Sequence, residues 1–222
     1  MHSRQFTSRV SIWFAVSATA LGLTSGVVAD DAGEFRSPCQ YRGDGGHYRW
    51  TVKIDPEQPP RSVAADNRLT PSQLFNWTGG RGTILSGTPR QGRENQWIQL
   101  TGKVTALLIE GDGDIHVELT NANGRSRAKA GAEIPAGRRW CRLRQVACGW
   151  TETNFPIVTK RRELNLKKHP VISVIGKAFW DGQHAPAATS RNAVRRNRRT
   201  YDSTCSAWEI HPVMKLTVQP SA

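Results

Sequence analysis

Residues 97–120, WIQLTGKVTALLIEGDGDIHVELT, decide the fold class of this chain. The part from Trp97 to Ile109 alternates well enough for a long strand, with Gly102 as an expected bulge or bend. The next four residues, EGDG, have the composition of a tight turn. Residues 114–120 then alternate with a strict period of two, so the stretch predicts two consecutive strands joined by a short turn.

Three further strands and one helix are expected downstream. Strand patterns cover residues 127–134, 171–180 and 208–218, and Pro212 should mark a bulge or an edge in the last one. A helical connection is expected within residues 151–164. Three strands, a helical connection and two strands is the order of an OB-fold. We therefore predict a mainly β fold, a five-stranded OB-like Greek-key barrel, and keep an open sandwich of the same strands as the alternative.

The N-terminal region divides into a signal peptide and an arm. Residues 1–29 combine the basic Arg4 and Arg9 with an apolar stretch and a small residue at Ala29, which is typical of a cleaved secretory signal peptide. Polar residues interrupt that stretch too often to favour a membrane anchor. Residues 30–95 are rich in Gly, Pro, Asn and Arg and should form an arm, which leaves residues 96–222 for the barrel domain.

Two short elements are expected within the arm. Residues 47–54 (HYRWTVKI) have the composition of a short strand. Thr70 is a favourable N-cap and Pro71 suits the first helical position, so a helix should begin there.

The four cysteines favour an oxidising compartment, either secreted or periplasmic. They are Cys39, Cys141, Cys148 and Cys205. An even number favours two disulfides, and a zinc site would need closer pairs than any in this chain. Among the three possible pairings we favour Cys141–Cys148, which closes a short loop, with Cys39–Cys205, which ties the N-terminal arm to the late loop and gains more from chain entropy.

Several motifs resemble those of an uncharacterised family of secreted bacterial proteins. They are GDGDIHV at residues 111–117, AEIP at 132–135, GxxFWDxxH at 176–184, WEIHPV at 208–213 and the arm sequence RWTVK at 49–53. The resemblance spans residues 47–218 and implies an OB-like barrel, but no particular activity. The arginine-rich insert after His184 departs from the family pattern, so no role of that loop is carried over.

Ionisable side chains cluster in three of these motifs. In residues 114–120 they alternate with apolar residues that should face the barrel interior, so the ionisable face should point outward. The last strand repeats this relationship, and two more ionisable residues directly follow the fourth strand. The set is Asp114, His116, Glu118, Asp181, His184, Glu209 and His211. We expect these side chains to converge near one end of the barrel.

Three interpretations of this cluster stay open. The first is structural, with histidine–carboxylate pairs that hold loops. The second is a divalent metal such as zinc bound by His116, His184 and His211, with Glu209 or Asp114 as the base of a hydrolytic reaction. The third is metal-free acid–base catalysis by the same side chains.

Charge is the other strong signal. The chain contains 31 Lys and Arg against 18 Asp and Glu, a formal net charge of +13, which favours an acidic partner. Basic residues surround Trp140 and recur at residues 160–162 and 167–168. The densest group lies in the predicted loop at residues 181–206 and comprises Arg191, Arg195, Arg196, Arg198 and Arg199. In an OB-fold this loop borders the ligand face, so these arginines are candidate binding residues.

These patterns favour a secreted OB-like module that binds a polyanion such as nucleic acid or an acidic polysaccharide. A metal-dependent, nuclease-like hydrolase and an interaction domain with neither activity are the alternatives. The chain has no Ser-His-Asp elbow, P-loop or dinucleotide fingerprint. The motifs therefore do not decide whether the chain is an enzyme. The composition excludes a membrane bundle, a coiled coil and a collagen-like chain.

Overall fold

The computed structural model describes residues 38–39, 48–79, 84–152, 162–182, 194–197, 200–202 and 204–220. The expected signal peptide lies outside these residues, as do the candidate site residues His184, Arg191, Arg198 and Arg199. Within the described ranges, no helix combines the length and the apolar character that crossing a membrane requires.

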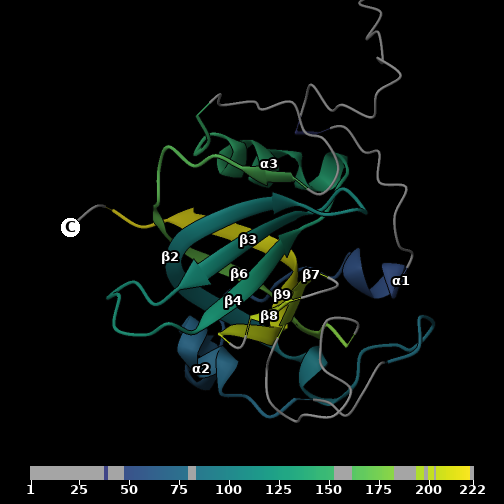
Figure 1. Ribbon diagram of the computed structural model, residues 1–222. Coiled ribbons are helices and arrows are strands. Elements are labelled where there is room, and N and C mark those ends of the chain that lie inside the picture. Colours follow the sequence, from purple (N-terminus) through teal and green to yellow (C-terminus); the bar gives the residue numbers. More distant parts are fainter. Residues whose placement is uncertain are drawn as a thin grey trace, which may run out of the picture.

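Five strands close into a barrel (Figure 1). They are β2 (Trp97–Ile109), β3 (Ile115–Thr120), β4 (Lys129–Ile134), β6 (Val171–Trp180) and β9 (Cys205–Val218). β2 pairs antiparallel with both β3 and β6, β4 pairs antiparallel with β3, and β9 pairs antiparallel with β6. The parallel pair β4–β9 completes the ring. The predicted OB-like barrel is therefore confirmed, and closure excludes the open sandwich.

The predicted strands match the observed ones closely. β2 and β6 begin and end at the predicted residues, and the expected turn forms where the amide of Gly113 donates to the carbonyl of Glu110. The register of β6 and β9 shifts between the pairs Gly176–Val213 and Ala178–Ile210, an interval that contains Pro212, which confirms the expected bulge. Gly102 has a different role from the one expected. A Cβ there would lie 2.6 Å from the Thr120 carbonyl, so Gly102 permits a close approach, while the bulge falls at Thr105.

The helix expected within residues 151–164 falls mostly on residues 153–161, which lie outside the described residues. Among the described residues between β4 and β6, helical structure is found earlier, as η3 (Arg138–Trp140) and α3 (Cys141–Cys148), and the end of the expected segment forms β5 (Arg162–Leu164), which pairs with β2. α3 has only eight residues, too few for a helical period to stand out in the sequence. It nevertheless buries Ala147 and Cys148, and Arg144 donates to the Ile134 carbonyl from within the fold, so α3 packs over one end of the barrel (Figure 1).

The strand expected at residues 47–54 is wrong, because this segment contains the helix α1 (Trp50–Lys53). Tyr48 and Val52 lie four residues apart, about one helical turn, and both pack against Phe179 of β6. The helix expected at Thr70 is confirmed as α2 (Pro71–Phe75), which has a complete capping box between Thr70 and Gln73.

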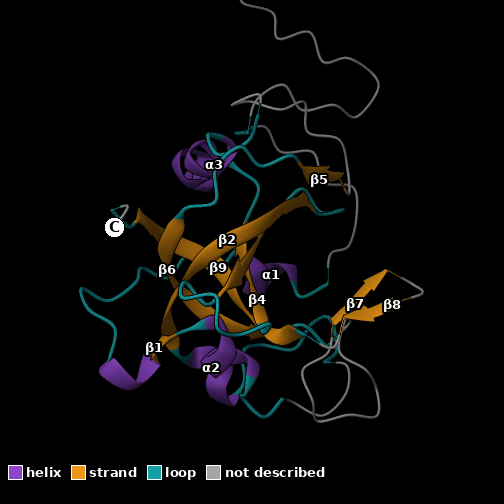
Figure 2. Ribbon diagram, turned by 60° about the vertical axis from the view of Figure 1, so that its left-hand side comes forward, coloured by secondary structure: helices purple, strands orange, loops and turns teal. Residues whose placement is uncertain are grey.

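The arm shares the core of the barrel. Leu69 of β1 (Arg68–Leu69), which runs parallel to β2, and Leu74 of α2 belong to the same buried cluster as the barrel interior. The 3-10 turns η1 (Ala65–Asn67) and η2 (Gly92–Asn95) complete the arm. Between β6 and β9, the strands β7 (Val194–Asn197) and β8 (Thr200–Asp202) form a hairpin that projects from the barrel (Figure 2).

The disulfide pairing differs from the expected one. Cys39 is bonded to Cys141, while Cys148 and Cys205 are buried thiols. Cys141 and Cys148 are the two ends of α3, seven residues apart and so roughly 10 Å along the helix axis, which is too far for a disulfide. The Cys205 Sγ lies 3.8 Å from a carboxylate oxygen of Glu118. The observed disulfide is typical of proteins from an oxidising compartment.

Candidate functional site

The N-terminal arm covers the outer face of β6 and β9. The guanidinium of Arg90 donates to the backbone carbonyls of Ala178 (2.7 Å) and His211 (2.6 Å), and the guanidinium of Arg49 lies 4.9 Å from the centre of the Phe179 ring. The sequence predicts that the ionisable face of the barrel points to solvent. That prediction is wrong for Asp114, Glu118, Glu209 and His211, which are all buried.

A buried ion pair holds the N-terminal arm against β6. Arg49 donates to both carboxylate oxygens of Glu94, at 2.6 and 2.8 Å, and to the carbonyls of Thr88 and Pro89. One oxygen of Glu94 also accepts the amide of Trp180 at 3.0 Å. Burial opposes ionisation of Glu94, but these hydrogen bonds outweigh it and hold the pKa of Glu94 below its usual value. The pair therefore ties the arm to β6.

His211 lies between two predicted site carboxylates. Its Nδ1 is 3.2 Å from Glu209, and its Nε2 is 3.1 Å from Asp114 without the alignment of a hydrogen bond. His211 and Asp114 are 0% exposed, and Asp114 also accepts the amide of Ala136. Three of the predicted residues are thus brought together, but away from solvent.

Burial dominates the titration of these three side chains. It lowers the pKa of His211 to about 3, helped by the charge of Lys53. It raises the pKa of Asp114 to about 7, with a contribution from Asp112, and raises the pKa of Glu209 well above its usual value. At neutral pH the imidazole is therefore neutral. Because the ring is fully buried, the geometry fits the structural interpretation here better than a metal site or acid–base catalysis.

Lys53 of α1 supplies positive charge to this acidic region. Its ammonium donates to Asp112 at 2.8 Å. Burial opposes its charge, but Asp112, Glu209 and Glu133 outweigh burial and raise the pKa of Lys53. The Asp112 carboxylate is likewise held ionised, because Lys53 lowers its pKa against the effect of burial. This pair joins α1 to the turn between β2 and β3.

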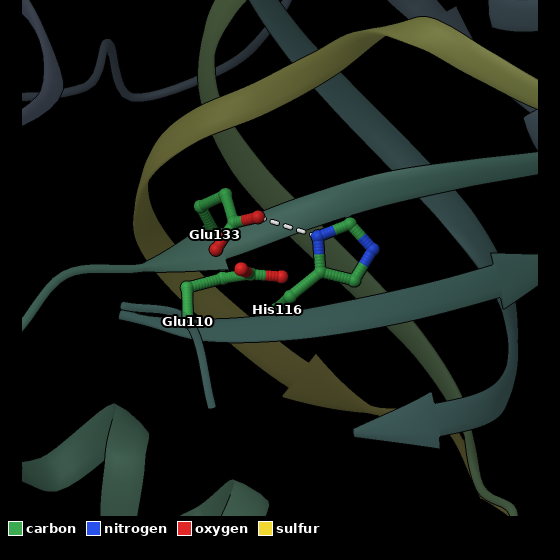
Figure 3. Close-up of side chains that lie close together, drawn as sticks. All are labelled: Glu110, His116 and Glu133. Carbon is green, nitrogen blue, oxygen red and sulfur yellow. Dashed lines mark hydrogen bonds and ion pairs between the residues drawn. The ribbon is translucent and has the colours of Figure 1, made fainter. Parts of the chain in front are cut away.

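His116 belongs to a second group nearer the surface (Figure 3). It lies on β3 opposite Glu133 of β4, and its Nδ1 is 2.5 Å from a carboxylate oxygen of that residue. Glu110, in the turn after β2, completes the group. Burial alone would lower the pKa of His116, but the carboxylates of Glu133 and Glu110 outweigh it and raise the pKa to about 9. The His116 side chain is 23% exposed, so this group is accessible from solvent.

The sequence interpretation missed Glu110 and Glu133. Glu133 could have been found by continuing the outward face of the third strand, where Gly131 and Glu133 lie opposite Glu118 and His116. Glu110 sits in a turn, where no strand periodicity indicates its direction. Only the fold brings it beside His116.

The remaining predicted residues are placed only in part. Asp181 follows β6, donates its amide to the Ala207 carbonyl, and is close enough for its charge to raise the pKa of Glu209. His184 lies outside the described residues. Arg195 and Arg196 are described as parts of β7 only. Binding of a metal by His116, His184 and His211 together, or hydrolysis at such a site, therefore stays a prediction.

Most of the exposed charged side chains among the described residues are basic. The buried acids are Glu94, Asp112, Asp114, Glu118, Glu133 and Glu209. The exposed acids are Glu57, Asp66, Glu152 and Glu163. The exposed Lys and Arg residues are far more numerous: Arg61, Arg68, Arg93, Lys103, Arg125, Arg127, Arg138, Arg139, Arg142, Lys167, Lys168 and Lys215. Arg49, Arg144 and Lys177 are buried as well, but basic side chains clearly predominate among the exposed ones.

Comparisons with family models, with curated proteins and with solved structures find no match to this chain. The resemblance to secreted bacterial proteins therefore stays a prediction.

Proposed function

We propose that this chain is an exported OB-like module that binds a polyanion, either a nucleic acid or an acidic polysaccharide. The observation that carries the proposal is the excess of exposed cations over exposed acids among the described residues. The less exposed acids are compensated by nearby cations, as in the Arg49–Glu94 and Lys53–Asp112 pairs, or are held protonated, as burial favours for Glu209. Each such pair cancels its own charge, so the field outside is dominated by the exposed cations.

One group of exposed cations gathers at the α3 end of the barrel. We call the α3 surface the side chains of Arg138, Arg139, Arg142, Lys167 and Lys168. The amides of Lys167 and Lys168 both donate to the carbonyl of Trp150, just after α3, so the two lysines lie beside the helix. Exposed lysines and arginines grouped in this way suit contacts with successive phosphate or sulfate groups.

The β7–β8 hairpin offers a second group. It lies between the last two barrel strands, in the loop that borders the ligand face of an OB-fold. Its strands include Arg195 and Arg196. The disulfide supports export, and outside the cell extracellular DNA and acidic polysaccharides are the polyanions that such a module would meet.

The proposal is tested by measuring affinity for single-stranded DNA and for heparin over a range of salt concentrations. The α3 variant R138S/R142S/K167S/K168S should weaken binding. Its control, R61S/R125S/R127S/K215S, removes the same charge, but from exposed positions elsewhere. Arg125 and Arg127 follow Thr120, the end of β3 that lies roughly 16 Å from Ile115 and the α3 end.

For every phosphate that the variant no longer binds, the slope of log affinity against log salt should fall by about 0.7 on single-stranded DNA. Equal weakening by the α3 variant and its control would show that the charge acts diffusely and would contradict a defined surface. Binding to heparin but not to DNA would identify a polysaccharide as the ligand, and the reverse a nucleic acid.

A further inference from the structure

The group formed by Glu110, His116 and Glu133 has the arrangement of a cation site. One ligand atom from each side chain lies within 4.8 Å of the other two. Figure 3 shows both glutamates extending toward the space beside the imidazole. The three residues come from the β2–β3 turn, β3 and β4, so the register of the barrel holds them in place.

One oxygen of Glu133 lacks a partner among the described residues. Its Oε1 faces His116, but its Oε2 is buried without a hydrogen bond, and the residue is only 5% exposed. In Figure 3 this second oxygen is turned toward the carboxylate of Glu110. A buried carboxylate oxygen that faces another carboxylate is unfavourable unless a cation or a proton lies between them.

The backbone is shaped to receive the imidazole. A Cβ at Gly131 would lie 2.6 Å from Cε1 of His116, and 3.3 and 3.4 Å from its two nitrogens. The ring is therefore packed directly against β4, and only glycine at position 131 leaves it room. Its orientation is fixed by packing as well as by Glu133.

We propose that Glu110, His116 and Glu133 bind a divalent transition-metal ion, with zinc as the expected ion. The ligands are Nδ1 of His116 and one oxygen from each glutamate. Imidazole together with carboxylates suits zinc or manganese better than calcium or magnesium, which prefer oxygen alone. This site is independent of the proposed binding of a polyanion.

Binding requires one local adjustment. The proton held between Nδ1 of His116 and Oε1 of Glu133 is released to solvent, and the metal takes its place. The two atoms then separate to about 3.4 Å, as expected for ligands each about 2.1 Å from a tetrahedral zinc ion. Because the chain supplies three ligands, at least one coordination position stays available for water or an anion. The partial exposure of His116 leaves that position accessible.

The test uses the whole folded chain, stripped with a chelator and dialysed. Zinc alone is titrated by calorimetry, followed by manganese and calcium. We expect one zinc ion per chain, weaker manganese binding and much weaker calcium binding. E110Q and H116Q should each lower zinc affinity by about 100-fold or more. The control is E163Q, which removes an exposed carboxylate from β5 and should leave affinity within about twofold.

Folding is checked separately by circular dichroism. Glu110 is only partly buried, so E110Q should stay folded even if H116Q does not, and E110Q alone then decides the outcome. The Co²⁺ form should show no sulfur-to-metal charge-transfer band, because Cys148 and Cys205 are not ligands. Three results would each overturn the site: no stoichiometric zinc binding, unchanged affinity in E110Q, or calcium binding as tight as zinc.

Discussion

Gly131 of β4 lies directly against the imidazole of His116 on β3, with 2.6 Å between the position of a Cβ at residue 131 and Cε1 of the ring. Because the two strands are paired, neither residue can move away without disturbing the ladder between β3 and β4. The variant G131A should therefore be destabilised by about 1–3 kcal/mol through overpacking. Thermal or urea melts measure this change.

The control for that experiment is Gly87. A Cβ at Gly87 would meet no atom within 4 Å, and G87A should change stability by no more than about 0.5 kcal/mol. Equal stability of G131A and G87A would show that His116 can turn aside, which would also weaken the argument for a fixed ligand.

The Arg49–Glu94 pair should be essential for docking the arm. R49M leaves a buried carboxylate and the carbonyls of Thr88 and Pro89 without their donor, and should cost about 3–5 kcal/mol. The double variant R49M/E94Q should be more stable than the sum of the single changes predicts, because it removes the uncompensated charge. Urea unfolding of the four proteins completes the cycle, and strict additivity would argue against direct coupling.

Asp114 and His211 should give opposing pH dependences of stability. The pKa of Asp114 is raised to about 7, so the folded state binds its proton first and this group stabilises the fold as pH falls from about 7 toward 4. The pKa of His211 is lowered to about 3, so its protonation favours the unfolded state below about pH 6.5. In the wild type the two contributions largely offset each other between about pH 4 and 6.5.

The variant D114N removes only one of these contributions. Its stability relative to wild type should fall progressively from pH 7 to 4, by at most about 1.4 kcal/mol per pH unit for one proton. The exposed Asp66 provides the control D66N. Urea unfolding at several pH values checks the result, and a constant difference between D114N and wild type would rule out this exchange of protons.

The cysteines make a simple chemical prediction. In denaturant without reductant, two thiols per chain should titrate, those of Cys148 and Cys205. Opening the Cys39–Cys141 bond, which closes a loop with a sequence separation of 102, should cost about 2–5 kcal/mol. Thiol titration and melts with and without reductant test both points. A count of zero would restore the two-disulfide interpretation of the sequence.

Strand alternation was enough to predict the barrel, because Ile115, Val117 and Leu119 fill its interior and specify the register of β3. On the opposite face the same alternation predicted exposed side chains, but Asp114 and His211 are buried. The carbonyl of His211 accepts from Arg90, and Asp112 in the turn before Asp114 accepts from Lys53; both cations come from the distant arm. No local pattern reports an interaction between segments so far apart in the chain.

The helices show the same limit. α2 was predictable because Thr70 and Gln73 form its cap locally. α1 was not predictable, because it has only four residues and its position depends on the packing of Tyr48 and Val52 on Phe179. The proposed metal ligand Glu110 lies in a turn, and only closure of the barrel reveals its neighbours.

The arginine-rich hairpin makes a separate prediction for binding. Replacing Arg195, Arg196, Arg198 and Arg199 with Ser should weaken binding to single-stranded DNA and flatten its salt dependence, by about 0.7 in slope for each phosphate that these arginines neutralise. Thermal melts of the variant check separately that it stays folded. An unchanged slope would exclude the hairpin as a binding surface.

The most direct test of the proposed function is the affinity of the wild-type chain for single-stranded DNA and heparin between about 50 and 200 mM salt. If the exposed cations form a polyanion-binding surface, log affinity should fall linearly with log salt, with a slope of about −3 or steeper on DNA when four or more phosphates are bound. Absence of binding to both ligands at about 50 mM salt, or a slope near zero, would contradict the proposal.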